Sequence, residues 1–387
     1  MQNDKKIKVL FRHRSMEMGG VEKVMLSLLH NLDSEKFEMT VLLNLNQGEL
    51  RDEIPSHVRK VYLVEGKEDL SKIAILQKIQ LLRRRKKLQK LIENPKYIDE
   101  NILKENYDIE IGMTYNDFDS VLNSSNKNSK KIGWFHSEIN IPKIQPLVPG
   151  ILKQFPQFHH MVYCSEKIKN IMHQSHPNLD YPSESVIINA IPAEEILLKS
   201  KEKISDFPSN TPVFVSIGRL HTRKGYHKLM DAHAKLISEG LQHSVLILGD
   251  GEEKKQLLEQ QKKLGVEKTF IFVGNKMNPY PYLAKSDFFI MPSESEAWPL
   301  VIAEAMISQK PIIATQVGDV PQMIDDQKTG YLINYSTQEI YQAMKLFLED
   351  NSIPQNLTKN LQELGNPFHP EKIFGQVEHL LTEIVKS

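Results

Sequence analysis

Residues 213–238 read VFVSIGRLHTRKGYHKLMDAHAKLIS, and this stretch indicates the fold of the whole chain. It begins with Val213–Ile217, a short apolar run of strand length. Gly218–Gly225 follows as a loop with glycine at both ends, and Tyr226–Ser238 carries apolar residues at helical spacing. A strand followed by a loop and a helix is the repeating unit of parallel α/β sheets.

The same alternation extends in both directions from this unit. In the first half, strands are expected at Lys8–Phe11, Met39–Leu43, Val58–Val64, Ile109–Met113, Lys131–Phe135, Met161–Cys164 and Val186–Ile188. In the second half, they are expected at Val213–Ile217, Val245–Leu248, Phe270–Val273, Phe288–Met291, Pro311–Ala314 and Tyr331–Ile333. Helices are expected at Val21–Leu32, Lys72–Leu91, Tyr226–Ser238, Glu252–Leu264, Leu300–Ile307 and Thr337–Leu348. The sequence therefore predicts an α/β protein with two doubly wound, Rossmann-like sheets.

A polar segment, Lys199–Thr211, separates the two series and reads as an interdomain linker. It divides the chain into an N-terminal domain, residues 1–198, and a C-terminal domain, residues 199–369. Ligands of open α/β sheets bind beyond the carboxyl ends of the strands, so two such domains facing each other are expected to enclose an interdomain cleft.

Composition excludes several classes of protein. The 387 residues include 49 Lys and Arg against 49 Asp and Glu, so the chain lacks the global positive field of a nucleic-acid binder. The single cysteine, Cys164, cannot form an internal disulfide. The apolar run Val9–Phe11 is too short for a signal peptide, and no run approaches the roughly 20 apolar residues of a spanning helix. We therefore expect a cytoplasmic protein.

The loop Gly218–Gly225 concentrates Arg219, Arg223 and Lys224 at a strand end. Guanidinium and ammonium groups at this position suit a diphosphate, because charge-assisted hydrogen bonds to phosphate are strong. The alternative is a solvated basic turn before a helix.

A second loop, Pro292–Pro299, follows the strand Phe288–Met291 and leads into a helix that carries Glu304. Glu296 in the loop and Glu304 in the helix can both point toward the sheet edge. Ionised carboxylates accept hydrogen bonds from the hydroxyls of a sugar or a ribose. Acids near a helix N-terminus also simply favour the helix dipole, and that reading stays open.

Two features of the first half also lie at strand ends. Gly19-Gly20 directly precedes a helix, whose exposed amides can receive an anion. His136 follows the strand Lys131–Phe135, where an acid/base or hydrogen-bonding histidine is useful, although a lone histidine is more often structural.

Two further candidates are weaker. Asp117-Phe118-Asp119 could hold a divalent ion, but its surroundings favour a helix cap. A cationic run within a helix could contact an anionic membrane surface, or it could be a plain solvated face. Its members are Arg83, Arg84, Arg85, Lys86 and Lys87.

Taken together, the motifs resemble family 4 of the nucleotide-sugar glycosyltransferases, the "group 1" retaining enzymes with the two-domain GT-B architecture. In the second half they are Val215–Leu220 with Lys224-Gly225, Leu246–Gly251, Phe272–Asn275, Asp287–Ser293 with Glu296 and Glu304, and Pro311–Thr315 with Thr329–Ile333. In the first half they are Gly19–Lys23, Trp134–His136, Cys164–Glu166 and Ile188–Pro192. The chain departs from the family at Ala297 and Gln309, where glycine is frequent, and at Gln322, where glutamate is frequent.

The resemblance implies a role for each matching residue. Arg219 and Lys224 would bind the donor diphosphate without a metal ion, Glu304 the ribose hydroxyls and Glu296 the sugar, while His136 would approach the anomeric centre. The implied catalytic set is Arg219, Lys224, His136 and Glu296. The implied donor-binding set is Gly19, Gly20, Gly218, Asn275, Lys276, Ala297, Trp298, Pro299, Leu300 and Glu304. The resemblance also implies that the C-terminal helix, Pro370–Val385, returns to the first domain.

The expected function is transfer of a sugar, with retention, from a nucleoside diphosphate to a hydroxyl of a glycan or lipid-linked acceptor. Uridine diphosphate sugars are the commonest donors in such enzymes, cell-surface polysaccharide biosynthesis is the expected setting, and no further cofactor is expected. Two alternatives remain: a nucleotide-sugar 2-epimerase, which needs no acceptor, and a non-catalytic binding subunit of a partner transferase.

Overall fold

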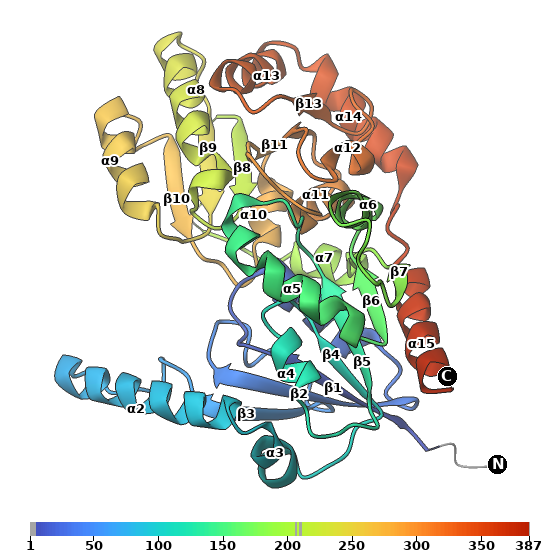
Figure 1. The fold of residues 1–387 in the computed structure, drawn as a ribbon. Helices are drawn as coiled ribbons and strands as arrows, with labels where there is room; N and C mark the ends of the chain where they lie inside the picture. The colour runs from blue at the N-terminus through green and yellow to red at the C-terminus, as the bar shows by residue number, and fades with distance from the viewer. Residues whose placement is uncertain (1–4, 206, 209–210, 387) are drawn as a thin grey trace. The chain divides into compact units, whose positions relative to one another are not determined.

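The computed structural model describes residues 5–205, 207–208 and 211–386 (Figure 1). Residues 206, 209 and 210 of the expected linker lie outside the described residues. The chain divides into two compact units: the first runs to Ala190 and also includes the C-terminal helix from Pro370, and the second is Ile191–His369. Each unit is built on one parallel sheet.

The sheet of the first unit has seven strands in the order β3-β2-β1-β4-β5-β6-β7. The strands are β1 Ile7–His13, β2 Phe37–Asn46, β3 Arg59–Glu65, β4 Ile109–Gly112, β5 Lys130–Phe135, β6 His160–Tyr163 and β7 Ser183–Val186. The helices are α1 Gly20–Asn31, α2 Ala74–Ile92, α3 Pro95–Tyr97, α4 Phe118–Leu122, α5 Val148–Gln154, α6 Glu166–Ser175 and α15 Pro370–Lys386, with shorter or irregular turns η1 Ile98–Leu103, η2 Pro142–Leu147 and η3 Phe155–Gln157.

The sheet of the second unit has six strands in the order β10-β9-β8-β11-β12-β13. They are β8 Val213–Ile217, β9 Ser244–Leu248, β10 Phe270–Gly274, β11 Phe288–Met291, β12 Ile312–Thr315 and β13 Tyr331–Ile333. The helices are α7 Ala193–Lys199, α8 Tyr226–Ser238, α9 Lys254–Leu264, α10 Tyr280–Lys285, α11 Leu300–Ile307, α12 Val320–Met323, α13 Thr337–Glu349 and α14 Ser352–Leu364, with a short turn η4 Thr222–Lys224. All residues of β9 and β11 are buried, as expected where helices cover both faces of a parallel sheet.

The predicted fold class is confirmed: both sheets are Rossmann-like, and in each the order of the strands reverses once. The reversal lies between β1 and β4 in the first sheet and between β8 and β11 in the second. Such switch points are where open α/β sheets bind ligands, so they position the candidate sites.

The division between the units falls after Ala190 rather than after residue 198. The reason is packing: Ile191, Ala193 and Ile196 belong to the apolar core of the second unit, so α7 lies with that unit. The C-terminal helix α15 belongs to the first unit, where the Glu378 carboxylate accepts hydrogen bonds from the Asp33 amide (3.0 Å) and the Lys36 ammonium (2.9 Å).

One predicted strand is displaced. The apolar run Val186–Ile188 predicted the last strand of the first sheet, but β7 is Ser183–Val186. This edge strand pairs with β6 through a mostly polar stretch, which the apolar pattern does not reveal. No helix within the described part of the chain combines the length and apolar content needed to cross a membrane.

Candidate active site

The two loops that the sequence singled out in the second unit emerge from neighbouring strands. Strand β8 pairs with β11 through Phe214 opposite Phe288 and Val215 opposite Phe289. Because both strands run in the same direction, the loops that follow them, Gly218–Gly225 and Pro292–Pro299, leave the same edge of the sheet. This edge is at the switch point of the second sheet.

Close backbone contacts fix the two loops against each other. Gly225 has a φ of +70°, and a β-carbon there would collide with the carbonyl oxygen of Pro292. The amide of Glu294 donates a 2.7 Å hydrogen bond to the carbonyl of Arg223. Only glycine combines this left-handed conformation with such a close approach, so Gly225 holds the basic loop beside the acidic one.

The centre of the site is a buried carboxylate with two cations. The Lys224 ammonium lies 2.6 Å from Glu296 Oε1, and Arg223 Nη1 lies 3.3 Å from Glu296 Oε2. The hydroxyl of Ser293 donates to Oε1 as well, at 2.7 Å. Arg223 also donates to the carbonyl of Ser295, at 2.8 Å. The arrangement fixes Lys224 in one position at the sheet edge.

Burial alone would raise the pKa of Glu296, since desolvation disfavours its charged form. The charges of Lys224 and Arg223 and the hydrogen bonds of Lys224 and Ser293 outweigh burial and hold the pKa of Glu296 below its ordinary value. The carboxylate is therefore ionised at neutral pH. An ammonium group has three N–H donors, and the bond to Glu296 occupies one of them.

Glu304 lies in α11, the helix that follows the acidic loop, and is also buried. The hydroxyl of Tyr280 donates to Glu304 Oε1 at 3.3 Å. Burial and the charge of Glu304 raise the pKa of Tyr280, so the tyrosine stays a neutral donor.

Arg219 does not join the cluster around Glu296. Its guanidinium pairs with Glu252 at 3.1 Å, and its side chain is 71% exposed. Arg219 is preceded by Gly218, where a β-carbon would press on the hydroxyl of Tyr226. Of the two cations expected to hold a diphosphate, the structure therefore places only Lys224 beside Glu296.

The remaining expected donor-binding residues of the second unit lie in the loop after β11, at the start of α11 and after β10. Ala297 accepts a 2.9 Å hydrogen bond from the Asp319 amide. The Trp298 ring packs edge-on against Phe368, with centroids 5.8 Å apart. Pro299 and Leu300 form the start of α11, and Asn275 and Lys276 follow β10.

Three polar side chains meet at the switch point of the first unit. His13 ends β1, and its Nδ1 lies 2.9 Å from Asp117 Oδ2, while its Nε2 lies 3.5 Å from Glu22 Oε1. Burial would lower the pKa of His13, but the charge and hydrogen bond of Asp117 raise it to about 10. Glu22 lies in the first turn of α1, and a β-carbon at Gly19 would collide with its carboxylate, so this cluster lies against the glycine loop.

His136 follows β5 and lies close to this cluster. Burial and the charge of His13 lower the pKa of His136 to about 3. Its Nε2 atom is buried and has no hydrogen-bond partner among the described residues. A neutral ring with an unsatisfied buried nitrogen can donate to or accept from a bound hydroxyl.

The expectation that Asp117 caps a helix needs a correction. Asp117 does precede α4, but its side chain makes no capping bond. Its Oδ2 instead accepts from the Thr114 amide and hydroxyl, at 3.1 and 2.8 Å, as well as contacting His13. Asp119 turns elsewhere and accepts from Gln154 at 2.6 Å. Among residues 5–205, 207–208 and 211–386, no group of three or more His, Cys, Asp or Glu side chains could hold a metal ion.

The sequence pattern places Arg223 in the basic loop but does not predict its contact with Glu296, and it does not predict that Ser293 and Tyr280 belong to the site. The signal for Arg223 and Ser293 was present, since both lie within the two loops. Tyr280 lies 24 residues before Glu304, and only the fold brings them together.

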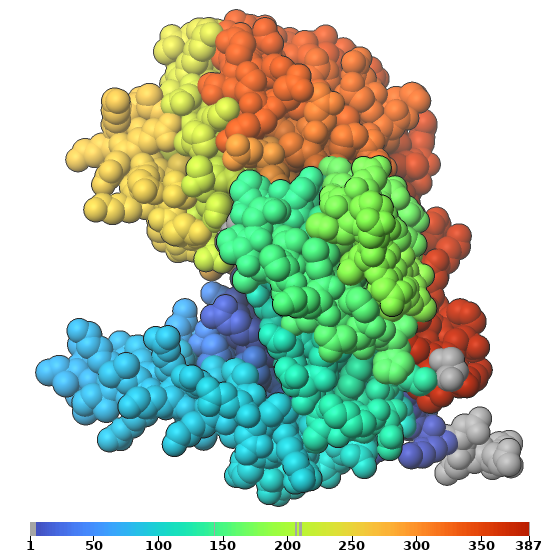
Figure 2. Space-filling view, in the orientation of Figure 1, coloured from blue at the N-terminus to red at the C-terminus, as the bar shows by residue number. Residues whose placement is uncertain are grey.

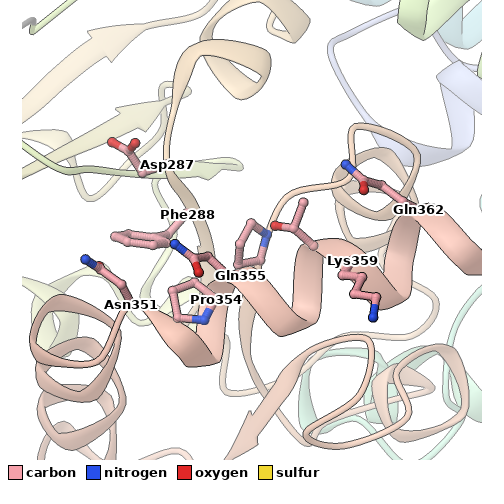
Figure 3. Close-up of a pocket in the computed structure, with 9 residues that line it drawn as sticks. Asp287, Phe288, Asn351, Pro354, Gln355, Lys359 and Gln362 are labelled. Carbon is pink, nitrogen blue, oxygen red and sulfur yellow. The ribbon is translucent and has the colours of Figure 1, made fainter.

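A hollow of about 350 Å³ in the second unit lies elsewhere (Figure 3). Asp287 and Pro311, which line it, precede β11 and β12, so it lies at the amino ends of these strands. The Asp287 carboxylate accepts a 2.8 Å hydrogen bond from the Val213 amide and has a structural role. None of the expected donor-binding residues lines this hollow.

Part of the chain matches a known protein family. Residues 199–364 match the family described as glycosyl transferases group 1. The chain is 31% identical over 193 residues to N-acetyl-alpha-D-glucosaminyl L-malate synthase of Bacillus anthracis, covering 49% of each chain. It is 30% identical over 198 residues to the lipopolysaccharide core biosynthesis glycosyltransferase LpsE of Rhizobium meliloti, covering 51% of this chain and 57% of the relative. The chain thus matches about half the length of these curated relatives.

Solved structures match almost the whole chain. Anabaena HepE in complex with UDP-glucose has a TM-score of 0.73 at 19% identity, covering 97% of this chain and 100% of that one. A mutant of S. aureus TarM, solved with Fondaparinux, alpha-GlcNAc-glycerol and UDP, has a TM-score of 0.70 at 14% identity, covering 97% of this chain and 99% of that one. At these identities the likeness shows the fold.

The fold is therefore that of the GT-B class, with two Rossmann-like domains. Residues 199–364, which lie within the second of these domains, match the glycosyl transferases group 1 family. The resemblance predicted from the motifs is confirmed.

Proposed function

We propose that this chain is a retaining, hexosyltransferase-like enzyme that moves a sugar from a nucleoside diphosphate to a hydroxyl of a glycan or lipid-linked acceptor. UDP is the expected leaving nucleotide, cell-surface polysaccharide biosynthesis the expected setting and the cytoplasm the expected location. The similarity to LpsE, named for lipopolysaccharide core biosynthesis, supports the setting. The HepE structure, solved with UDP-glucose, supports the donor.

One observation carries the proposal: Lys224 is held 2.6 Å from the buried Glu296 at the switch point of a Rossmann-like sheet. Breaking the bond between sugar and diphosphate places negative charge on the leaving phosphate. A cation that is already fixed stabilises this charge where it develops, without reorganisation during the reaction. Lys224 would supply that charge itself, which is why we propose transfer without a metal ion.

The other residues would bind the donor. Glu304 accepts from the ribose hydroxyls, and the residues from Ala297 to Leu300 contact the sugar. Arg219, at the exposed end of the basic loop, reaches the outer part of the diphosphate. In the first unit, Gly19 and Gly20 offer amides to the phosphates, and the neutral ring of His136 contacts the transferred sugar near the anomeric carbon.

The test is turnover of UDP-hexoses by the purified chain, with and without glycan or lipid-linked acceptors. Lys224→Ala should lower kcat by about 10²–10³, because it removes one preorganised charge from the leaving group. Lys255→Ala, on the exposed side of α9, is the matched control and should leave kcat unchanged. The anomeric configuration of the product, read by NMR, tests retention.

Three outcomes would contradict the proposal. Unchanged turnover of Lys224→Ala would remove this lysine from the mechanism. Epimerised donor in the absence of acceptor would assign the chain to the 2-epimerases. Donor binding without transfer or hydrolysis would indicate a non-catalytic subunit.

A further inference from the structure

Helix α2 of the first unit is largely exposed to solvent. None of its 19 residues is buried, and Figure 1 shows the helix extending from β3. Leu88 and Leu91 pack against the apolar cluster beneath β2 and β3, and they attach the second half of the helix to the unit. Figure 2 shows α2 as a ridge that extends away from the rest of its unit.

The outward side of α2 carries an apolar strip. Ile75, Ile79 and Leu82 are 73%, 42% and 63% exposed. Their spacing of four and three residues places them in one row on the helix surface. Lone apolar residues on a surface are ordinary, but three aliphatic side chains in a row on a protruding helix form an unpartnered face.

Cations flank this strip on both sides. At about 100° per residue, Lys78 and Arg85 lie on one side of the row, Arg83 and Lys87 lie on the other, and Lys86 continues it. All five side chains belong to exposed residues. The helix contains no acidic residue.

Arg84 differs from the other cations of the run. Its guanidinium turns to the sheet and donates to Gln47 Oε1 at 3.1 Å and to the Glu65 carbonyl at 3.4 Å. Four members of the run of five predicted from the sequence therefore face outward.

We propose that α2 docks the chain on an anionic lipid bilayer. The helix lies in the plane of the interface, with Ile75, Ile79 and Leu82 among the upper acyl chains. Arg83, Arg85, Lys86 and Lys87 contact the anionic headgroups. An apolar row between cations is the pattern of helices that lie in a membrane interface, and each cation near an anionic surface adds to the attraction.

Charge complementarity favours a lipid surface over a second copy of this chain. In a symmetric pair the same face meets itself, and the outward cations of the two helices would repel each other. An anionic bilayer instead offers headgroups to every cation and an apolar layer to the strip. This proposal does not depend on the proposed transfer reaction.

The test is flotation of the full chain with two kinds of vesicle. One contains phosphatidylcholine with about a quarter phosphatidylglycerol, and the other contains phosphatidylcholine alone. We expect the chain to float with the anionic vesicles and to remain at the bottom with the neutral ones. Added salt should weaken the binding, because it screens the headgroup attraction.

Two variants separate the contributions of the strip and the cations. The first variant carries Ile79→Asp and Leu82→Asp, and the second carries Arg85→Glu and Lys86→Glu. Each variant should lower the partition coefficient between anionic vesicles and water by about tenfold or more. The matched control is Leu258→Asp with Lys262→Glu on α9, where the replaced residues are also exposed. All replaced residues are exposed, so circular dichroism should show an unchanged fold.

The proposal is overturned if the chain does not float with anionic vesicles, or if the α9 control loses as much binding as the α2 variants. It is also overturned if sedimentation shows a dimer of the wild-type chain that Ile79→Asp with Leu82→Asp dissociates. In that case the strip is an interface between two copies.

Discussion

A buried carboxylate that stays charged is the residue on which the candidate site depends. Glu296 is 8% exposed, and desolvation of its charge is offset by Lys224, Arg223 and Ser293. Removing one partner of a buried ion pair is costly, because the other charge is left without compensation. The contacts of Glu296 with these residues are therefore also expected to stabilise the fold of the second unit.

Glu296→Gln should therefore lower the free energy of unfolding at pH 7, by about 3 kcal/mol. The pKa of Glu296 is lowered in the folded state, so its contribution is present above the pKa of the unfolded chain and is lost as pH falls through the folded pKa. The difference in the free energy of unfolding between variant and wild type should be smaller at pH 3 than at pH 7. Urea unfolding at both pH values measures it.

Glu294→Gln is the matched control on the same loop, since Glu294 is exposed. It should change stability by less than about 0.5 kcal/mol at either pH. If Glu296→Gln lowers the free energy of unfolding by the same amount at pH 7 and pH 3, the charge of Glu296 is not what stabilises the loop.

Gln309 occupies a conformation that suits glycine. Its φ is +54°, in the left-handed region, and it follows Ser308, the C-cap residue of α11. Gln309→Gly should raise the free energy of unfolding by about 0.5–1 kcal/mol, because relief of the strain exceeds the extra entropy of the unfolded glycine.

Gln342→Gly replaces an exposed residue within α13. This change should lower the free energy of unfolding by about 1 kcal/mol, whereas Gln309→Gly should raise it. Thermal unfolding of both variants checks the pair. A loss of stability in Gln309→Gly would show that the side chain makes a contact worth more than the strain.

At the scale of elements, the site depends on how two loops meet. Gly225→Ala and Gly265→Ala offer a direct comparison, because the two glycines have φ values of +70° and +69°. A β-carbon at Gly265 meets nothing within 4 Å, whereas one at Gly225 collides with Pro292. Backbone strain of about 1–2 kcal/mol should appear in both variants.

Only Gly225→Ala should also move the acidic loop and weaken nucleotide binding. Chemical unfolding measures the backbone strain in both variants, and titration with UDP measures their nucleotide affinity. Equal UDP affinity in the two variants would show that the packing of Gly225 on Pro292 does not position the site.

Elements with a clear pattern could be predicted from the sequence. β8, α8, β11 and α11 have the predicted bounds, because apolar strands and amphipathic helices repeat with fixed periods. The sequence pattern does not predict short elements such as α7 and α10, because they are too brief to show a helical period. The polar edge strand β7 was displaced for the related reason that an edge strand needs few apolar residues.

The site could be predicted in part. Loops that follow strands were identified because the topology of α/β sheets places ligands there. The pairing of Lys224 with Glu296 could not be derived, since it depends on β8 lying beside β11 and on the packing of Gly225. The outward turn of Arg219 toward Glu252 is likewise a matter of side-chain contacts that spacing does not encode.

At the scale of the whole molecule, the two units are assembled from three stretches of chain. The helix α15 completes the first unit, and Ile373, Val377 and Leu381 are buried in it. The residues proposed to bind the donor divide between the units, with Gly19, Gly20 and His136 in the first. The contact that we propose between Glu304 and the ribose of the nucleotide lies in the second unit.

This proposed contact is tested most directly by calorimetric titration of UDP into the full chain and two variants. Glu304→Gln replaces the buried carboxylate with an amide of the same shape, and Glu259→Gln makes the same change on the exposed side of α9. We predict that UDP binds the wild type and Glu259→Gln equally, and binds Glu304→Gln at least about tenfold more weakly. No binding of UDP to the wild type, or equal affinity for all three proteins, would contradict a nucleotide site at the carboxyl ends of β8 and β11.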